Sequence, residues 1–599
     1  MKKAISLFLI IFLFFVSSAQ TATRIVILHT NDMHSRLTGF GPETAYTPLS
    51  VNDDKTLGGF ARIAAILKEE RSKNSGITLT VDAGDFLMGT LFQHLEPSTG
   101  FQLPLMKQMG YDVVAVGNHE FDFGPEKLAE ILSSSSHRGA VPAILLGNIK
   151  FDSKDKRDDA LEDHFRNGTL RDSYIIEREG VRFGFFSLLG KVAVDNAAFS
   201  APVTFSSQVA TARRHVKKLR NEGCDVVICL SHSGVEADGS GGWKGEDVEL
   251  AKKIRGIDAI ISGHTHTFID KPLIINGVPV VQTGDYGKSV GRLTLVLENG
   301  KVRVEEEKLI IVDDRTTGDP EINEAIERQK KVIDDQILRP LGLEYSRAVA
   351  ESAFLLECNE QGDVEASNLG PFVADAIHSY VNRHSEKGTD VSLVATGVIR
   401  ENILPGLQTP ADIFRIMSMG KGRDNLPGYP LASLYVTGRE LKSILEILNV
   451  SWKSTPANYC YFSGIRVETD PEGGLLKKIR KIEIISPDGS GKRNVDFSKK
   501  DTTLYSITAN SYMLQFIGII KKMSFGLINV TPKDSSGVKI TDMSNAVADM
   551  DQTQPGIREG KEWLAVMEYM KLMRDTDGNG IPDIDNEYRN AIKTHFPVK

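Results

Sequence analysis

Residues 24–34 read RIVILHTNDMH, in which a short run rich in Ile, Val and Leu leads into the polar cluster Asp32-Met33-His34. The same arrangement recurs after the runs 77–81, 113–116, 226–230 and 259–261. Runs of this length and composition are typical of buried strands. We therefore expect strands of one sheet with polar residues at their carboxyl ends. The further clusters are Gly84-Asp85, Gly117-Asn118-His119-Glu120-Phe121-Asp122, Ser231-His232 and Gly263-His264-Thr265-His266.

The residue types in these clusters suit catalytic metal ions. Asp, neutral His and the Asn carbonyl oxygen are ligands for Mn²⁺, Zn²⁺, Fe or Co²⁺ with open coordination positions, whereas a structural zinc site more often uses Cys. Strand ends hold such ligands rigidly beside a crevice. One carboxylate can bridge two metal ions about 3.5–4 Å apart, and such a pair activates water for displacement at phosphorus. Asp85 stands alone after its strand and is the predicted bridge.

Five clusters at five strand ends make chance a weak explanation, and the pattern predicts a two-metal hydrolase. A single His near a strand end is more often structural than metal-binding. We interpret four histidines outside the clusters in that way: His29, His94, His137 and His378.

The motifs around these residues resemble the 5'-nucleotidase family of calcineurin-like metallophosphoesterases. The resemblance covers about residues 24–310, and a weaker similarity to the family's C-terminal substrate domain covers much of 340–550. It implies an α/β fold, with a four-layer metallophosphoesterase sandwich followed by a separate α/β substrate-binding domain. The motifs are HTNDMHSRL (29–37), GGFARIA (58–64), DAGDFLMGT (82–90), GNHEFDFG (117–124), LSHSG (230–234) and SGHTHT (262–267).

The resemblance also implies a role for each residue of the clusters. Two divalent transition metal ions (Mn, Zn, Co or Fe) are expected. One would be surrounded by Asp32, His34, Asp85 and His266, and the other by Asp85, Asn118, His232 and His264. Some members have Gln in place of His266, which leaves the first metal open. His119 and Asp122 resemble the family's catalytic pair, in which an imidazole held protonated by a carboxylate stabilises charge on the phosphoryl group.

Length and composition bound the remaining possibilities. At 599 residues the chain is too long for one core, and 41% hydrophobic and 25% charged residues are ordinary for a globular protein. A net charge of −8 gives no reason to expect nucleic-acid binding. We predict a metallophosphoesterase domain at 23–315, an interdomain helix within 316–340 that starts near Asp319-Pro320, a substrate-binding domain at 341–555 and an extension at 556–599.

The N-terminus predicts export. Lys2 and Lys3 precede an apolar stretch at 4–16 and the small residues 17–19, the pattern of a signal peptide cleaved after Ala19. An uncleaved anchor is the alternative, but the stretch is shorter than the roughly 20 residues of a spanning helix. The mature chain is expected without a transmembrane segment, in the periplasm or outside the cell. The cysteines do not form a disulfide-rich pattern, and Cys224 and Cys229 are predicted core thiols.

The second half offers candidates for substrate binding. EASNLGPFVADAI (365–377) and SLVATGVIR (392–400) resemble family segments, and Arg400 is the candidate clamp on phosphate or carboxylate oxygens, with a surface ion pair as the alternative. Family members sandwich the base between two aromatic rings, and Tyr459 or Tyr461 with Tyr512 is the predicted sandwich. Packing in a strand core is the alternative for these rings.

Two segments depart from the family pattern. Residues 513–522 replace a Gly-Gly-Asp-Gly-Tyr segment, and 413–420 lack the usual Pro-Phe-Gly-Asn. The substrate is therefore a nucleotide, a nucleotide sugar or another phosphate ester. Three alternatives remain: a 2',3'-cyclic-nucleotide phosphodiesterase, the thiosulfate-oxidation hydrolase that resembles this family, and a non-catalytic surface binding protein. The oligomeric state stays open.

The C-terminal tail contains a separate candidate site. Residues 575–585 read DTDGNGIPDID, with oxygen donors at alternate positions around glycines, as calcium loops require. The loop lacks the usual twelfth-position Glu, where Asn586 stands, and resembles short Asp-rich calcium repeats of exported bacterial proteins. A flexible acidic tail is the alternative. The predicted calcium ligands, with a structural role, are Asp575, Asp577, Asn579 and Asp583.

Overall fold

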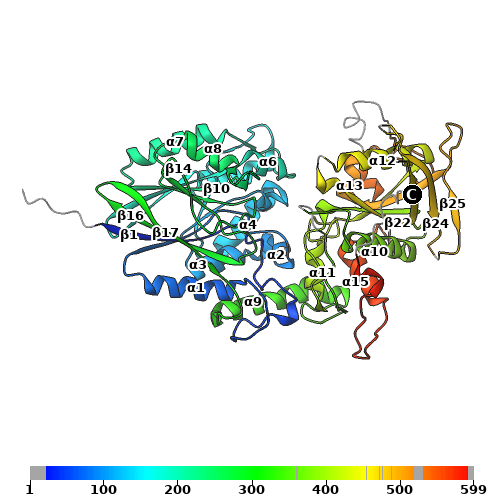
Figure 1. Ribbon diagram of the computed structural model, residues 1–599, viewed down its shortest axis with the longest axis horizontal. Helices are drawn as coiled ribbons and strands as arrows, with labels where there is room; N and C mark the ends of the chain where they lie inside the picture. Colours follow the sequence, from blue (N-terminus) through cyan, green and yellow to red (C-terminus); the bar gives the residue numbers. More distant parts are fainter. Residues whose placement is uncertain are drawn as a thin grey trace, which may run out of the picture.

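The chain forms two α/β lobes that lie side by side along the long axis of the molecule (Figure 1). The computed structural model describes residues 22–590 except 359–361, 454, 471, 475, 488 and 518–529. The predicted signal peptide at 1–19 and the part of the departing segment from 518 onward lie outside the described residues.

The predicted strands of the first domain are all strands, but they belong to two sheets. The first has the order β17 (Lys301–Ile311), β16 (Ser289–Glu298), β1 (Thr23–Thr30), β2 (Ile77–Asp82), β3 (Val113–Ala115), β4 (Ala143–Leu145) and β6 (Leu170–Arg171). The second has the order β14 (Leu273–Ile275), β15 (Val278–Val281), β13 (Ala259–Ser262), β10 (Val226–His232), β8 (Val181–Leu189) and β7 (Ser173–Arg178).

The prediction of one sheet was therefore wrong. A run of apolar residues predicts a strand, but it does not say which strand pairs with it. β1, β2 and β3 pair in parallel in the first sheet, and β10 and β13 pair in parallel in the second. The two sheets pack face to face over a core that contains Ile27, Leu79, Phe185, Ile228 and Ile261.

Helices cover both outer faces of this pair of sheets. α1 (Phe60–Lys73), α2 (Leu91–Thr99), α3 (Gln102–Met109) and α4 (Gly124–Arg138) share a core with the outer side of the first sheet. α7 (Gln208–Asn221) and α8 (Glu246–Lys253) pack on the second sheet. The layers run α/β/β/α, which confirms the four-layer sandwich. Shorter elements are α5 (Asp159–Arg166), α6 (Lys191–Asn196), β5 (Ile149–Lys150), β9 (Thr204–Phe205), β11 (Glu236–Ala237) and β12 (Trp243–Lys244).

One helix lies where the interdomain helix is expected. α9 (Pro320–Ile333) begins after Asp319, whose carboxylate accepts hydrogen bonds from the N–H groups of Glu321 and Ile322 at 3.0 and 3.2 Å. Pro320 at the first helical position lacks only an N–H that would find no partner there. α9 packs on α1, α2 and α3, and a π-helical turn, Asp334–Leu338, ends it.

The second domain has its own sheet and helices. Its main sheet has the order β21 (Leu431–Thr437), β26 (Leu504–Asn510), β19 (Val391–Ala395) and β22 (Cys460–Ser463). α12 (Gly438–Ser451) packs on one side of this sheet and α10 (Leu369–His384) on the other. The remaining elements are β18 (Ala350–Ser352), β20 (Gly406–Gln408), α11 (Pro410–Ile416), β23 (Ile465–Thr469), β24 (Ile479–Ile485), β25 (Lys492–Asn494), α13 (Ser511–Ile517) and α15 (Glu562–Lys571).

Residues within 556–590 pack into the second domain through α15. α15 lies against α10 and α11, and Trp563 is fully buried with its Nε1 donating to the carbonyl of Pro427 at 2.8 Å. Cys224 and Cys229 are buried thiols, as predicted.

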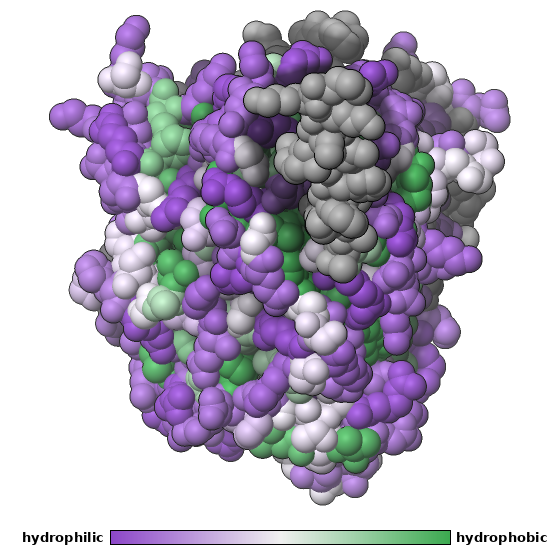
Figure 2. Space-filling model, turned by 90° about the vertical axis from the view of Figure 1, so that its left-hand side faces the viewer, coloured by the Kyte–Doolittle hydropathy of each residue, from purple (hydrophilic) through white to green (hydrophobic). Residues whose placement is uncertain are grey.

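Hydrophilic side chains cover most of the end of the first domain (Figure 2), where hydrophobic residues form only small separate areas. Among the described residues, no helix has the length and apolar character needed to cross a bilayer.

Candidate metal centre and the cavity beside it

Three of the five loops, those that follow β1, β2 and β13, share an unusual backbone conformation. Five of the seven predicted metal-binding residues adopt positive φ: Asp32 (50°), His34 (50°), Asp85 (56°), His264 (79°) and His266 (53°). Non-glycine residues rarely adopt this conformation, and it persists where the surrounding structure holds it in place, as at functional sites. The site is also tightly packed at Gly117, because a Cβ atom there would lie 2.2 Å from Oδ1 of Asp85.

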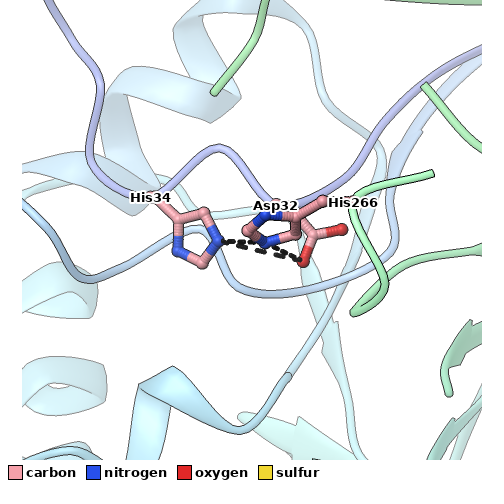
Figure 3. A group of neighbouring side chains, drawn as sticks. All are labelled: Asp32, His34 and His266. Atoms are coloured by element: carbon pink, nitrogen blue, oxygen red, sulfur yellow. Dashed lines mark hydrogen bonds and ion pairs between the residues drawn. The ribbon is translucent and has the colours of Figure 1, made fainter. Parts of the chain in front are cut away.

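Asp32, His34 and His266 form the first group of potential metal ligands, with donor atoms within 4.8 Å of one another. Nε2 of His34 lies 2.9 Å from Nε2 of His266. Oδ1 of Asp32 lies 3.6 Å from Nε2 of His266 and 3.9 Å from Nε2 of His34. Figure 3 shows the two rings and the carboxylate turned toward one another.

Asp85, His232 and His264 form the second group. Nε2 of His232 lies 3.0 Å from Oδ2 of Asp85 and 3.2 Å from Oδ1 of Asn118. The same nitrogen is 3.9 Å from Oδ1 of Asp32, so the two groups adjoin. All seven predicted ligands are therefore brought together by the fold.

Hydrogen bonds from the surrounding backbone orient these side chains. Nδ1 of His232 donates to the carbonyl of Ala83 at 3.0 Å, which directs Nε2 into the cluster. The N–H of His264 donates to Oδ2 of Asp32 at 2.9 Å, and Nδ2 of Asn31 donates to the same oxygen at 2.6 Å. Such outer contacts fix the ring orientation of metal-binding histidines.

The charges of the cluster fit bound cations. Burial raises the pKa of Asp32 to about 8, and it lowers the pKa of His264 to about 3 and of His266 to about 4. Both rings are therefore neutral, which is the metal-binding form. Burial also lowers the pKa of His232, but the charges of Asp85 and Asp32 outweigh it and raise that pKa to about 10. The proton on His232 neutralises buried carboxylates, a task that a divalent cation would perform.

Glu120 holds the second group in place, a role that reasoning from the sequence missed. Its carboxylate accepts hydrogen bonds from the N–H groups of Gly117 at 2.5 Å, Leu87 at 2.9 Å and Asp85 at 3.2 Å. It thus ties the loop after β2 to the loop after β3. The residue stands inside a quoted motif, but its type alone does not distinguish a backbone acceptor from a metal ligand.

The predicted catalytic pair lies against this cluster. Nδ1 of His119 lies 3.0 Å from both carboxylate oxygens of Asp122, and the N–H of His119 donates to Oδ1 of Asp85 at 2.8 Å. Burial lowers the pKa of the His119 imidazole, but the charges of Asp122 and Asp85 outweigh burial and hold that pKa above its ordinary value. His119 can therefore donate a proton or a hydrogen bond into the site.

A cavity of about 670 Å³ between the two domains opens on these residues. Its first-domain wall includes Asp85, His119 and His264, and its second-domain wall includes Arg400. Within the described part of the chain, Nε of Arg400 is buried without a hydrogen-bond partner. The structure thus favours a guanidinium directed at the cavity over a surface ion pair.

Buried contacts between the domains position Arg400. The neighbouring Glu401 forms an ion pair with Arg36 of the first domain, and it accepts a hydrogen bond from Nε of Arg415 at 3.2 Å. Arg415 also donates to the carbonyl of Gly41 in the first domain at 2.9 Å. Because these groups are buried, breaking one pair would leave a charge without a partner.

The expected aromatic sandwich is not assembled. Tyr459 and Tyr461 are 4% and 1% exposed, and the Tyr461 hydroxyl donates to the carbonyl of Val364 at 2.7 Å. Side chains alternate in the extended chain from Tyr459 into β22, so Cys460 lines the cavity while both tyrosines turn into the core. Tyr512 does line the cavity, and its ring stacks on Tyr429, with centroids 5.3 Å apart. Strand-core packing thus describes Tyr459 and Tyr461.

In the structure, a carboxylate from another part of the chain lies beside the acidic tail loop, which the sequence did not indicate. Asp577 and Asp583 lie with Glu351 of β18 in a group whose oxygens are within 4.8 Å of one another. Nδ2 of Asn579 donates to Glu351 at 3.0 Å. Asp575 accepts from the N–H groups of residues 578 and 580 at 2.7 and 2.9 Å, and so closes the turn.

Both halves of the chain match models of known protein families. Residues 25–268 match the model of the calcineurin-like phosphoesterases, and residues 348–518 match that of the 5'-nucleotidase C-terminal domain. The trifunctional nucleotide phosphoesterase protein YfkN of Bacillus subtilis is 26% identical over 520 residues, which are 82% of this chain and 32% of that protein. The chain thus spans about a third of that relative's length. The 5'-nucleotidase of Diplobatis ommata is 23% identical over 525 residues, 82% of each protein.

The crystal structure of a 5'-nucleotidase precursor from Thermus thermophilus has the same fold, with a TM-score of 0.64 and 21% identity, over 94% of this chain and 99% of that chain. The fold and the two ligand groups define a metal-dependent phosphoester hydrolase of the calcineurin-like class. With its second domain included, the chain belongs to the 5'-nucleotidase family.

Proposed function

We propose that the chain is an exported dinuclear-metal phosphohydrolase that removes phosphate from nucleotides. One observation carries the proposal. A single cavity of about 670 Å³ is lined by predicted metal ligands, by His119 and by Arg400, so one small phosphate ester can contact all of them. The names of the relatives, nucleotide phosphoesterase and 5'-nucleotidase, support nucleotides as the substrate class.

The proposed ligands divide between two ions that share Asp85. Asp32, His34 and His266 complete the first site, and Asn118, His232 and His264 complete the second. The donor set of carboxylate, amide and neutral imidazole suits Mn, Zn, Co or Fe. When bound, such a pair of ions neutralises phosphate oxygens and makes a water molecule nucleophilic at neutral pH.

The side chains around the cavity perform the remaining tasks. Arg400 holds an anionic oxygen of the substrate, for which a planar guanidinium with an unpartnered Nε is suited. His119, kept protonated by Asp122, donates a hydrogen bond to the phosphoryl oxygens as charge develops and assists the leaving oxygen. The products would be a nucleoside and inorganic phosphate.

The second-domain wall supports an alternative on the same scaffold. Aliphatic side chains, among them Leu393, Ile444 and Met513, line the cavity where a pair of aromatic rings is expected. A 2',3'-cyclic-nucleotide phosphodiesterase or a nucleotide-sugar hydrolase would use the same metal ligands with this different wall. A non-catalytic binding protein would not need the complete ligand set.

The decisive experiment is an activity panel. Phosphate release is measured from AMP, UMP, 2',3'-cyclic AMP, a UDP-sugar and an aryl phosphate, with Mn²⁺, Zn²⁺ or Co²⁺ and with chelator. Chelator-sensitive turnover that favours nucleoside monophosphates is the expected result. Preference for the cyclic nucleotide or the UDP-sugar would establish the alternative, and no turnover with any metal would overturn the proposal.

We further propose that the tail loop binds calcium through Asp575, Asp577, Asn579 and Asp583, with Glu351 as an additional ligand and a structural role. Calcium that binds only the folded chain would raise its melting temperature by at least about 2 °C. Asp577→Ala should abolish that rise, whereas the exposed-site control Glu222→Ala should retain it. An equal rise in both variants would exclude the loop.

A further inference from the structure

A second cavity, of about 870 Å³, lies behind the proposed catalytic pair. Asp122 lines this second cavity, whereas its partner His119 lines the cavity of the metal centre. The stacked rings of Tyr429 and Tyr512 also line different cavities, with Tyr429 in the second cavity and Tyr512 in the cavity of the metal centre. The two cavities share no lining residue and are separate spaces. A volume of this size is typical of small-molecule sites.

A buried histidine without a partner lines the second cavity. His94 on α2 is 7% exposed, and neither of its ring nitrogens has a hydrogen-bond partner among the described residues. The rings of Phe123 and Phe414 flank it, with centroids 5.3 and 5.5 Å away. Burial lowers the pKa of His94 to about 3, so the neutral ring offers one donor and one acceptor. Buried polar groups normally find partners, and a ligand in the cavity would supply them.

The N-terminus of α4 and a loop of the second domain bring positive charge to the same cavity, which favours an anionic ligand. α4, a helix of 15 residues, starts in the cavity wall at Gly124, and Phe123 before it provides no side-chain cap. Uncapped N–H groups and the helix dipole at such an end favour a phosphate. Lys421 and Arg423 line the same cavity, and neither forms an ion pair with another described residue. These groups together attract an anionic ligand.

Carboxylates in the wall narrow the ligand class. Glu126 and Asp542 line the second cavity alongside the cations. A bare phosphate ion would be repelled by them and would leave His94 without a partner. Hydroxyl groups on the ligand would donate to the carboxylates and exchange hydrogen bonds with His94. We propose that the second cavity binds a polyhydroxylated phosphate ester, such as a sugar phosphate, independently of the metal centre.

The test is calorimetric titration of the manganese-loaded chain with the methylenephosphonate analogue of ribose 5-phosphate, which no phosphatase can hydrolyse. Two sites are expected in the unaltered chain. Arg400→Ala should weaken the site at the metal centre, whereas Lys421→Ala combined with Arg423→Ala should weaken only the second site, by about tenfold or more. A second site that survives the double substitution unchanged would overturn the proposal.

His94→Phe is the sharper variant. It keeps an aromatic ring of similar size between Phe123 and Phe414 but without ring nitrogens, so the fold is expected to persist. Loss of a hydrogen bond should weaken the second site about fivefold, and His137→Phe on the exposed end of α4 serves as the matched control. Inorganic phosphate that binds the second site as tightly as the phosphonate would disprove the role of the hydroxyl groups. The titration needs no turnover, so an inactive enzyme would refute the proposed function and leave this result standing.

Discussion

The two walls of the active-site cavity differ in the chemistry of their side chains, since the first carries metal-binding donors and the second carries Arg400 beside aliphatic groups such as Leu393. In the first domain all seven expected metal ligands converge from five strand ends. In the second domain Arg400 and Tyr512 reach the cavity, whereas Tyr459 and Tyr461 are buried elsewhere. Metal binding demands particular donor atoms, so residue type reveals position. A tyrosine serves equally well in a core or at a surface, and its type does not reveal which side of a strand it occupies.

The largest effect is expected from a substitution in the first-domain wall. Asp85→Ala removes the proposed bridging ligand and leaves His232 and His264 without their carboxylate partner. Bound metal, measured by mass spectrometry of the elements, should fall to near zero, and turnover should fall by about a thousandfold or more. The exposed His137→Ala should change neither. Full metal content and activity in Asp85→Ala would make the bridging assignment wrong.

The next effect separates chemistry from metal binding within the same wall. His119→Ala removes the imidazole that Asp122 holds at 3.0 Å, but it leaves every proposed metal ligand in place. General acid catalysis and charge stabilisation of this kind contribute about 10²–10⁴ in rate. We expect kcat to fall within that range while metal content stays unchanged. If the metal were lost as well, His119 would belong to the metal site instead.

The sequence predicted the strands better than their pairing into sheets. It also predicted the metal ligands better than the residues that hold or complete these sites. The runs that contain Ile27 and Ile228 both look like buried strands, and only the structure shows that they face each other from different sheets. Glu120 and Glu351 were missed because their roles depend on partners brought close by folding. Carboxylates are common, and nothing in the local sequence distinguishes one that binds a distant backbone N–H.

A smaller effect tests the second wall. Arg400→Ala should lower kcat/KM by about thirtyfold or more, since a charge-assisted contact is worth roughly 2 kcal/mol or more. Metal content should not change, because Arg400 is not among the proposed ligands. Arg439→Ala, on the exposed start of α12, is the matched control. Equal kinetics for the two variants would remove Arg400 from substrate binding.

The smallest effect decides between the two tyrosine positions. Tyr512→Ala removes a ring that lines the cavity and should raise KM for a nucleotide about fivefold or more, the loss expected for one stacked base. Tyr461→Phe removes a hydroxyl that bonds the Val364 carbonyl in the core. It should lower the free energy of unfolding by about 1 kcal/mol and leave KM unchanged. Kinetics and urea unfolding give a KM and a free energy of unfolding for each of the two variants. A raised KM in Tyr461→Phe without a loss of stability would return that ring to the substrate and reverse the contrast between the walls.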